Sequence, residues 1–180
     1  MNRLVAVESQ EDIFPQYRGT PIGKLLEYHN LGRSIEEEYT QAELLIGMCM
    51  DNRKHLRIPD NFAYILRAGG ANLRPSEFKV SYAVGVGGVR TISLIGHTNC
   101  GMVNLMARKR AFVDGLVDAG WERDVAEDHF HHFSPIFEIG NEVDFVLSEA
   151  KRLRLRYPLV RVAPLLYRVE DNRLYLIRES

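Results

Sequence analysis

The sequence predicts an α/β protein with a central, largely parallel β-sheet flanked by helices. Three apolar segments, at residues 44–49, 62–66 and 91–95, have the length of buried strands. Segments with helical features follow the second and third of them. An alternation of strands and helices is typical of a parallel sheet, because parallel strands need long crossover connections.

Length and composition bound the domain organisation. The chain has 180 residues, enough for one substantial hydrophobic core, so we expect a single domain over residues 1–180. Within it we expect an N-terminal helical arm over 1–40, a core that carries the functional residues over 41–110, and a helical region followed by C-terminal strands over 111–180. A formal net charge of -1 gives no bias toward nucleic acid or membrane surfaces.

No segment has the features of a secretory signal or of a membrane span. The N-terminus lacks a long apolar stretch, and no window approaches the roughly 18 apolar residues that a bilayer requires. We therefore expect a cytoplasmic protein. Its two cysteines are then expected to serve metal binding or catalysis rather than a structural disulfide.

The first predicted element is a helix over residues 20–32. Thr20 is a suitable N-cap, Pro21 suits the first turn, and Gly32 stops the helix. The strand at 44–49 follows, and the polar residues 51–54 end it. Cys49 therefore lies at the carboxyl end of a predicted strand.

The next elements repeat this order. The strand at 62–66 leads into a turn at Gly69–Gly70, and Ser76 caps a helix that extends toward Gly85. The third strand, 91–95, is closed by Gly96 and precedes His97.

The second half is predicted to be mainly helical before a final hairpin. We expect a helix that ends at Arg108, only broken helices over 111–134, and a stronger helix over 141–157 that Asn141 caps. Two β-rich segments, 160–169 and 173–177, read as a C-terminal hairpin.

The candidate metal-binding residues lie where two predicted strands end. Cys49 and His97 follow different strands, and Cys100 comes three residues after His97. In parallel sheets, ligands bind beyond the carboxyl ends of the strands. Two thiolates and an imidazole suit Zn²⁺, and three protein ligands leave a fourth tetrahedral position open for water or substrate. Zinc can lower the pKa of bound water to about 7, which provides a hydroxide nucleophile.

Asp51 and Arg53 form the second half of the candidate site. A carboxylate two residues from a ligand could accept a hydrogen bond from the hydroxide or could take the fourth metal position itself. Arg53 could hold that carboxylate by a bidentate pair. Alone, such a pair is more often a surface ion pair, so its interpretation depends on the adjacent Cys49.

Two segments resemble the signature segments of the β-class carbonic anhydrases: CMDNR at residues 49–53 and GHTNCG at 96–101. Between them, residues 65–71 are similar to the arginine-plus-glycine turn of that family, with Ala68 where an asparagine usually follows the arginine. The resemblance covers roughly residues 46–102.

This resemblance implies a zinc enzyme, a carbonate dehydratase, that interconverts CO₂ and bicarbonate. It implies Cys49, His97 and Cys100 as metal ligands, and Asp51 as the hydroxide acceptor held by Arg53. It also implies a homodimer or higher homo-oligomer, with the N-terminal helix reaching across to a partner. Some family members have a closed site in which the equivalent of Asp51 binds zinc, and the sequence leaves both states open.

Two alternative functions remain at this stage. The resemblance also implies a second activity, because a few close relatives of the carbonic anhydrase family hydrolyse carbonyl sulfide or carbon disulfide with the same ligands. The width and polarity of the access channel would discriminate between these substrates. The other alternative is a catalytically silent zinc-binding relative. His129, His131 and His132 suggest a second metal site or a proton relay, although neighbouring charges favour an exposed polar segment.

Overall fold

A six-stranded sheet forms the centre of the fold. The computed structural model describes residues 3–34 and 38–179, so small parts of the predicted N-terminal arm, including residues 35–37, lie outside the described residues. The strands are β1 (Leu4–Ala6), β2 (Leu44–Cys49), β3 (Ala63–Ala68), β4 (Thr91–His97), β5 (Arg161–Arg168) and β6 (Arg173–Ile177). Their order is β1-β6-β5-β4-β2-β3. The adjacent strands β5, β4, β2 and β3 are parallel, and β6 and β1 extend the sheet in antiparallel pairing, which confirms the predicted sheet.

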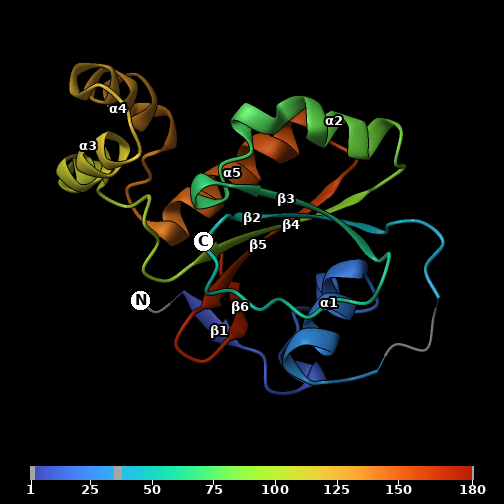
Figure 1. The fold of residues 1–180 in the computed structure, drawn as a ribbon. Helices are drawn as coiled ribbons and strands as arrows, with labels where there is room; N and C mark the ends of the chain where they lie inside the picture. Colours follow the sequence, from blue (N-terminus) through green and yellow to red (C-terminus); the bar gives the residue numbers. More distant parts are fainter. Residues whose placement is uncertain (1–2, 35–37, 180) are drawn as a thin grey trace.

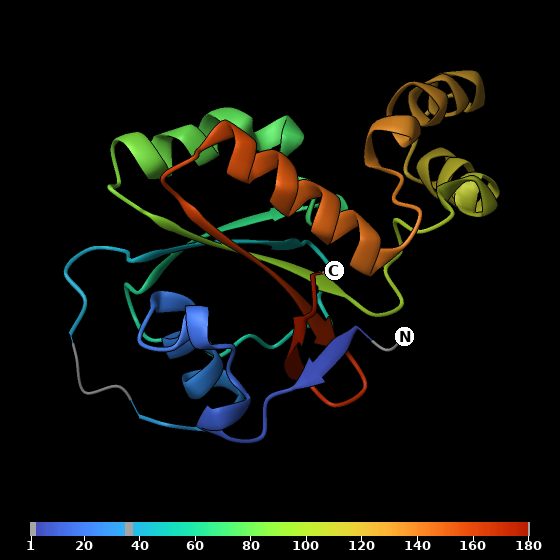
Figure 2. The same ribbon diagram turned by 180° about the vertical axis from the view of Figure 1, so that it is seen from behind.

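Helices cover both faces of this sheet. Helix α1 (Pro21–Asn30) lies on one face, and α2 (Glu77–Gly85) and α5 (Glu142–Arg156) lie on the other (Figure 1). Helices α3 (Lys109–Asp118) and α4 (Arg123–Phe137) pack against each other and stand apart from these layers (Figure 2). None of the helices that the structure describes is long and apolar enough to cross a membrane.

The two faces of the sheet carry separate hydrophobic clusters. Leu25 and Leu26 of α1 are buried in one cluster, and Val146 and Leu153 of α5 are buried in the other. Every residue of β2 is buried, as expected for a parallel strand covered on both faces.

Two of the three predicted N-caps, Thr20 and Asn141, form capping hydrogen bonds, whereas Ser76 precedes α2 without one. The side chain of Thr20 accepts a hydrogen bond from the backbone N–H of Gly23. The Oδ1 atom of Asn141 accepts bonds from the backbone N–H groups of Val143 and Asp144, at 3.0 and 3.1 Å. These bonds satisfy backbone donors that the first helical turn leaves unpaired. The predicted C-terminal hairpin is also present as β5 and β6.

The stretch after β4 differs from the prediction. The predicted helix ending at Arg108 is wrong: a turn follows Cys100, Asn104 has a left-handed backbone with φ 53°, and only a short 3₁₀ segment, Leu105–Arg108, precedes α3. The expected strand end at Gly96 is also early, since β4 continues through His97. A side chain at Gly96 would lie 2.7 Å from Val146 Cγ2, so glycine lets α5 pack closely there.

The broken helices expected over 111–134 are instead two regular helices. Phe112 of α3 packs on Phe130 of α4, with ring centroids 5.2 Å apart, and Lys109 pairs with Glu127 at 3.2 Å. The polar residues that suggested irregular structure mostly lie on the exposed faces of these helices. Helix–helix packing therefore stabilises a segment with weak sequence signals.

The N-terminal segment also departs from expectation. Strand β1 was not predicted, because three residues give too short a pattern, yet it pairs with β6. Helix α1 packs on its own sheet through fully buried leucines rather than extending away from it. The expectation that this helix reaches across to a partner stays a prediction.

Candidate metal centre

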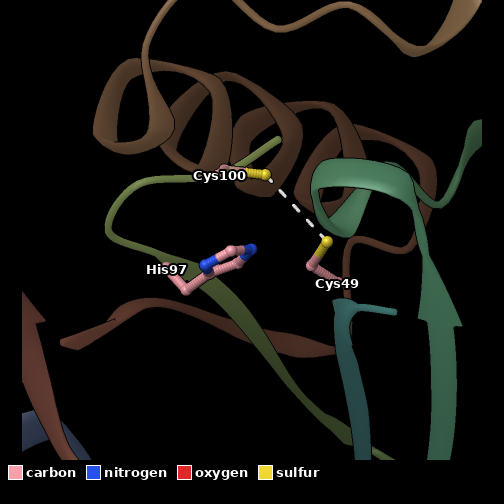
Figure 3. A group of neighbouring side chains, drawn as sticks. All are labelled: Cys49, His97 and Cys100. Atoms are coloured by element: carbon pink, nitrogen blue, oxygen red, sulfur yellow. Dashed lines mark hydrogen bonds between the residues drawn. The ribbon is translucent and has the colours of Figure 1, made fainter. Parts of the chain in front are cut away.

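The structure brings together the three residues predicted to bind zinc. One ligand atom of each of Cys49, His97 and Cys100 lies within 4.8 Å of the others (Figure 3). Cys49 ends β2, His97 ends β4, and Cys100 lies in the turn that follows. Because β2 and β4 are parallel neighbours, their carboxyl ends meet at the same edge of the sheet. The three residues are only 2%, 1% and 4% exposed.

The donor atoms are arranged as a tetrahedral metal would require. The Sγ atoms of Cys49 and Cys100 are 4.0 Å apart, close to the roughly 3.8 Å that two Zn–S bonds of about 2.3 Å imply at a tetrahedral angle. His97 Nδ1 lies 3.0 Å from the carbonyl oxygen of Thr98, to which it can donate. Its Nε2 atom is buried and has no hydrogen-bond partner among the described residues. An unpaired buried imidazole nitrogen beside two thiols fits a zinc site.

Hydrogen bonds favour a thiolate at Cys49. The thiol of Cys100 donates to Cys49, and the backbone N–H of Gly70 lies 3.3 Å from Cys49 Sγ. These bonds lower the pKa of Cys49 to about 3. The hydrogen bond to Cys49 conversely raises the pKa of Cys100. Without a metal, the two sulfurs thus share one proton, and a cation at the centre would replace it.

Asp51 and Arg53 form the bidentate pair that the sequence suggested. Arg53 Nε donates to both carboxylate oxygens of Asp51 at 3.0 and 3.2 Å, and Nη2 donates to Oδ2 at 2.7 Å. These bonds hold the pKa of Asp51 well below its usual range. Oδ2 also lies 3.9 Å from His97 Nε2. An ionised carboxylate therefore borders the candidate metal position.

Comparisons by sequence find no relative. No family model matches the chain, and no curated protein matches it.

Comparison with solved structures does find similar folds. A β-carbonic anhydrase from Trichomonas vaginalis superposes with a TM-score of 0.63 at 15% identity, over 85% of this chain and 93% of that one. A carbonic anhydrase from Streptococcus mutans gives 0.60 at 19% identity, over 84% and 91%. The apo form of a carbon disulfide hydrolase gives 0.56 at 20% identity, over 78% and 80%.

This chain has the β-carbonic anhydrase fold. The strand-end cluster of Cys49, His97 and Cys100 therefore lies on a scaffold shared with carbonic anhydrases and with a carbon disulfide hydrolase.

Within this fold, two glutamates that the sequence did not single out hold the turn around Cys100. Glu142 Oε1 accepts the backbone N–H of Cys100 at 3.1 Å. Glu170 accepts from Thr98 Oγ1 and Asn99 Nδ2, each at 2.8 Å. Arg53 Nη2 adds a bond to the carbonyl oxygen of Asn99 at 2.9 Å. Both glutamates are distant in sequence from the turn, so no local pattern could have identified them.

Lys54 is a further missed residue. It directly follows Arg53, and its polar neighbours suggested only the end of a strand. Its side chain is buried, however, and Nζ donates to the carbonyl oxygen of Asp51 at 2.9 Å. A buried lysine beside the candidate centre is a signal that only the structure provides.

An apolar pocket of about 430 Å³ borders the metal cluster. Its lining residues are Met50, Gly69, Met102, Leu105, Phe112, His129, Phe130, Phe133, Ser134 and Phe137. Met50 directly follows Cys49, and Gly69 directly precedes Gly70, whose backbone N–H donates to Cys49 Sγ. Most of the remaining wall comes from the segment between Met102 and Phe137. Helices α3 and α4 and the turn before them thus form most of the wall of this pocket.

The histidine cluster does not assemble into a site. His131 and His132 are exposed on α4, whereas His129 packs among the rings of Phe112, Trp121 and Phe133. Within residues 3–34 and 38–179, the only group of metal-binding side chains is the one at Cys49. A second metal site is therefore not supported by these histidines.

Proposed function

We propose that this protein is a zinc-dependent hydro-lyase that interconverts CO₂ and bicarbonate in the cytoplasm. The observation that carries the proposal is the buried cluster of Cys49, His97 and Cys100, with an ionised Asp51 3.9 Å from His97 Nε2. The β-carbonic anhydrase fold supports it by placing this cluster at the carboxyl edge of the sheet.

Each side chain has a distinct role in this proposal. Cys49, His97 and Cys100 would hold zinc, which when bound supplies a hydroxide nucleophile near neutral pH. Asp51 Oδ2 would accept the hydrogen bond of the attacking O–H group and so orient its lone pair toward the substrate carbon. Arg53 keeps that carboxylate ionised and fixed. Orientation of this kind is a large part of enzymatic rate acceleration.

The apolar pocket suits an uncharged substrate. Its wall is made almost entirely of aromatic, methionine and leucine side chains, which favour a neutral gas over water and over anions. In this proposal, linear CO₂ would approach the centre from the pocket side.

Carbonyl sulfide or carbon disulfide hydrolysis is the second candidate. The volume of about 430 Å³ is much larger than CO₂ requires, and its apolar wall suits the more lipophilic sulfur compounds. The fold is compatible with this activity, since a carbon disulfide hydrolase is among the similar structures.

The geometry argues against a silent, closed centre. For Asp51 to take the fourth metal position, its bonds from Arg53 would have to break or shift. In this structure both carboxylate oxygens are engaged by Arg53, which favours an accessible centre.

Direct assays separate these possibilities. Zinc-loaded protein would be tested by stopped flow with CO₂ between about pH 6.5 and 9, the range in which a zinc-bound water titrates, and then with carbonyl sulfide and carbon disulfide. Cys49→Ser is the matched control. Zinc-dependent turnover of CO₂ that this variant lacks supports the first candidate, and turnover of the sulfur compounds alone supports the second. A zinc-replete protein inactive on all three gases would be a silent relative.

Self-association is part of the proposal. Large apolar side chains are exposed on the edge strand β3 and the adjoining α2 region, namely Tyr64, Ile65, Phe78, Tyr82 and Val86. Exposed apolar surface beside an unpaired strand edge favours pairing with a second copy. We therefore include a homodimer or higher homo-oligomer in the proposed functional unit.

A further inference from the structure

Lys54 is a buried basic residue that forms no ion pair with a carboxylate within residues 3–34 and 38–179. The residue is 4% exposed, and its Nζ donates to the carbonyl oxygen of Asp51 at 2.9 Å. A buried ammonium group is costly unless nearby negative charge compensates it, so its position calls for an explanation.

Without a metal, negative charge at the cysteine cluster and at Asp51 compensates this ammonium group. Burial lowers the pKa of Lys54, while the charges of Cys49, Asp51 and Cys100 raise it. Arg67 opposes them, but it is exposed and reaches only the carbonyl oxygen of Cys49, at 3.5 Å. Lys54 is therefore a buried basic side chain that interacts electrostatically with Cys49, Asp51 and Cys100.

The hydrogen bond from Lys54 also holds the main chain of Asp51 in place. Asp51 is held by Arg53 through its carboxylate and by Lys54 through its main-chain carbonyl. The two contacts therefore fix both the carboxylate and the main-chain carbonyl of Asp51, which borders the candidate metal position. Loss of either contact would let the carboxylate change its angle to the centre.

We infer that Lys54 is a positioning residue of the metal centre, which fixes the main chain of Asp51 and supplies the positive charge that draws small anions to the metal. The inference rests on the proposed function, since it requires a metal at Cys49, His97 and Cys100. Two thiolates neutralise a divalent ion, so an additional buried cation makes the net charge of the centre positive. A positive centre binds anionic ligands more tightly. Bicarbonate belongs to this chemical class.

Three substitutions separate the effect of the positive charge of Lys54 from the effect of its side chain on folding. Lys54→Met keeps the apolar stem and removes the charge, Lys54→Gln keeps a hydrogen-bond donor without charge, and Lys54→Arg keeps the charge. The probe is azide, which would be titrated into the Co²⁺-substituted protein while the visible absorption of the metal is followed. Metal content and thermal unfolding would be measured on the same samples.

We expect both neutral variants to bind azide about five- to tenfold more weakly than the wild type, because each lacks the unit positive charge of Lys54. Lys54→Arg should stay within about twofold, because it retains the charge. A merely structural lysine would instead change the unfolding temperature and leave azide affinity unaltered.

The outcomes also distinguish this inference from the proposed function. If the wild type binds no Co²⁺ at the centre, the proposed function fails and the inference fails with it. If Co²⁺ binds but the neutral variants retain wild-type azide affinity, only the inference is overturned. If both neutral variants fail to fold while Lys54→Arg folds, Lys54 supports the fold, and the inference is again overturned.

Discussion

The backbone N–H of Gly70 lies 3.3 Å from Sγ of Cys49, which joins the turn after β3 to the thiol at the end of β2. Gly70 has φ 63°, a left-handed conformation that side chains rarely adopt. A Cβ atom there would lie 3.1 Å from Ile139 Cγ2. The conformation of this turn therefore orients a hydrogen bond onto the candidate metal ligand.

Gly70→Ala should weaken zinc binding. The left-handed conformation costs a non-glycine residue about 1–2 kcal/mol, and relaxation of the turn would move the N–H away from Cys49. We expect about a tenfold loss of zinc affinity, measured by competition with a chromogenic chelator. Gly19→Ala is the control, because Gly19 has φ 67° with no atom within 4 Å of the added Cβ. Equal zinc affinity in both variants would show that the contact with Cys49 has no role.

Arg53→Met should reduce turnover without removing the metal. The substitution deletes the bidentate pair that holds Asp51 and the bond to the carbonyl oxygen of Asn99. We expect kcat for CO₂ hydration to fall about tenfold or more, with zinc content unchanged. Arg110→Met serves as the control, since the Arg110 side chain is 96% exposed. Loss of zinc together with activity would instead assign Arg53 to metal retention.

Stability should fall in mild acid partly because of His29. Burial lowers the pKa of His29, whose Nδ1 lies 3.0 Å from the N–H of Arg57 and whose Nε2 lies 3.0 Å from the carbonyl oxygen of Asn172. The unfolded chain takes up a proton near the ordinary pKa of about 6.5, whereas the folded protein resists protonation until lower pH. The stabilisation that neutral His29 contributes is therefore fully present above about pH 6.5, and it is lost as the pH falls through the lower pKa of His29 in the folded protein.

Denaturant unfolding at a series of pH values tests this sign. His29→Gln should show a shallower decline in the free energy of unfolding below about pH 6.5 than the wild type, because it lacks the titrating group. His132→Gln, at an exposed position on α4, should keep the wild-type slope. An unchanged slope in His29→Gln would refute the assignment.

Self-association should depend on the exposed edge of the sheet. Ile65 on β3 and Phe78 on α2 are 42% and 81% exposed. We expect Ile65→Lys combined with Phe78→Glu to shift the protein to monomer in sedimentation velocity, because buried unpaired charges oppose an apolar interface. Phe133→Glu, on α4 outside this surface, is the control. A monomeric wild type would remove the oligomer from the proposal.

The sequence was most informative where signals are local. Buried runs such as residues 44–49 identified strands, and Thr20 and Asn141 identified helix starts. The pattern of Cys49, His97 and Cys100 indicated the side chains that the structure brings together as a candidate metal cluster. These features depend on a few adjacent residues. The long apolar runs also identified the parallel sheet correctly.

The remaining features depend on contacts between distant segments. Helices α3 and α4 are stabilised by packing against each other, and β1 exists only because β6 offers it a partner. Glu142 and Lys54 acquire their roles only once the chain has folded. Such roles leave no periodic pattern, so sequence reasoning could not find them.

We propose that zinc held by Cys49, His97 and Cys100 drives hydration of CO₂. The most direct measurement is a titration of the metal-free protein with Zn²⁺, in which bound zinc and the initial rate of CO₂ hydration are measured on each sample. We expect the rate of CO₂ hydration to rise in proportion to bound zinc and to stop rising at one ion per chain. The Cys49→Ser variant should remain at the uncatalysed rate. One tightly bound zinc per chain with CO₂ hydration at the uncatalysed rate would contradict this proposal.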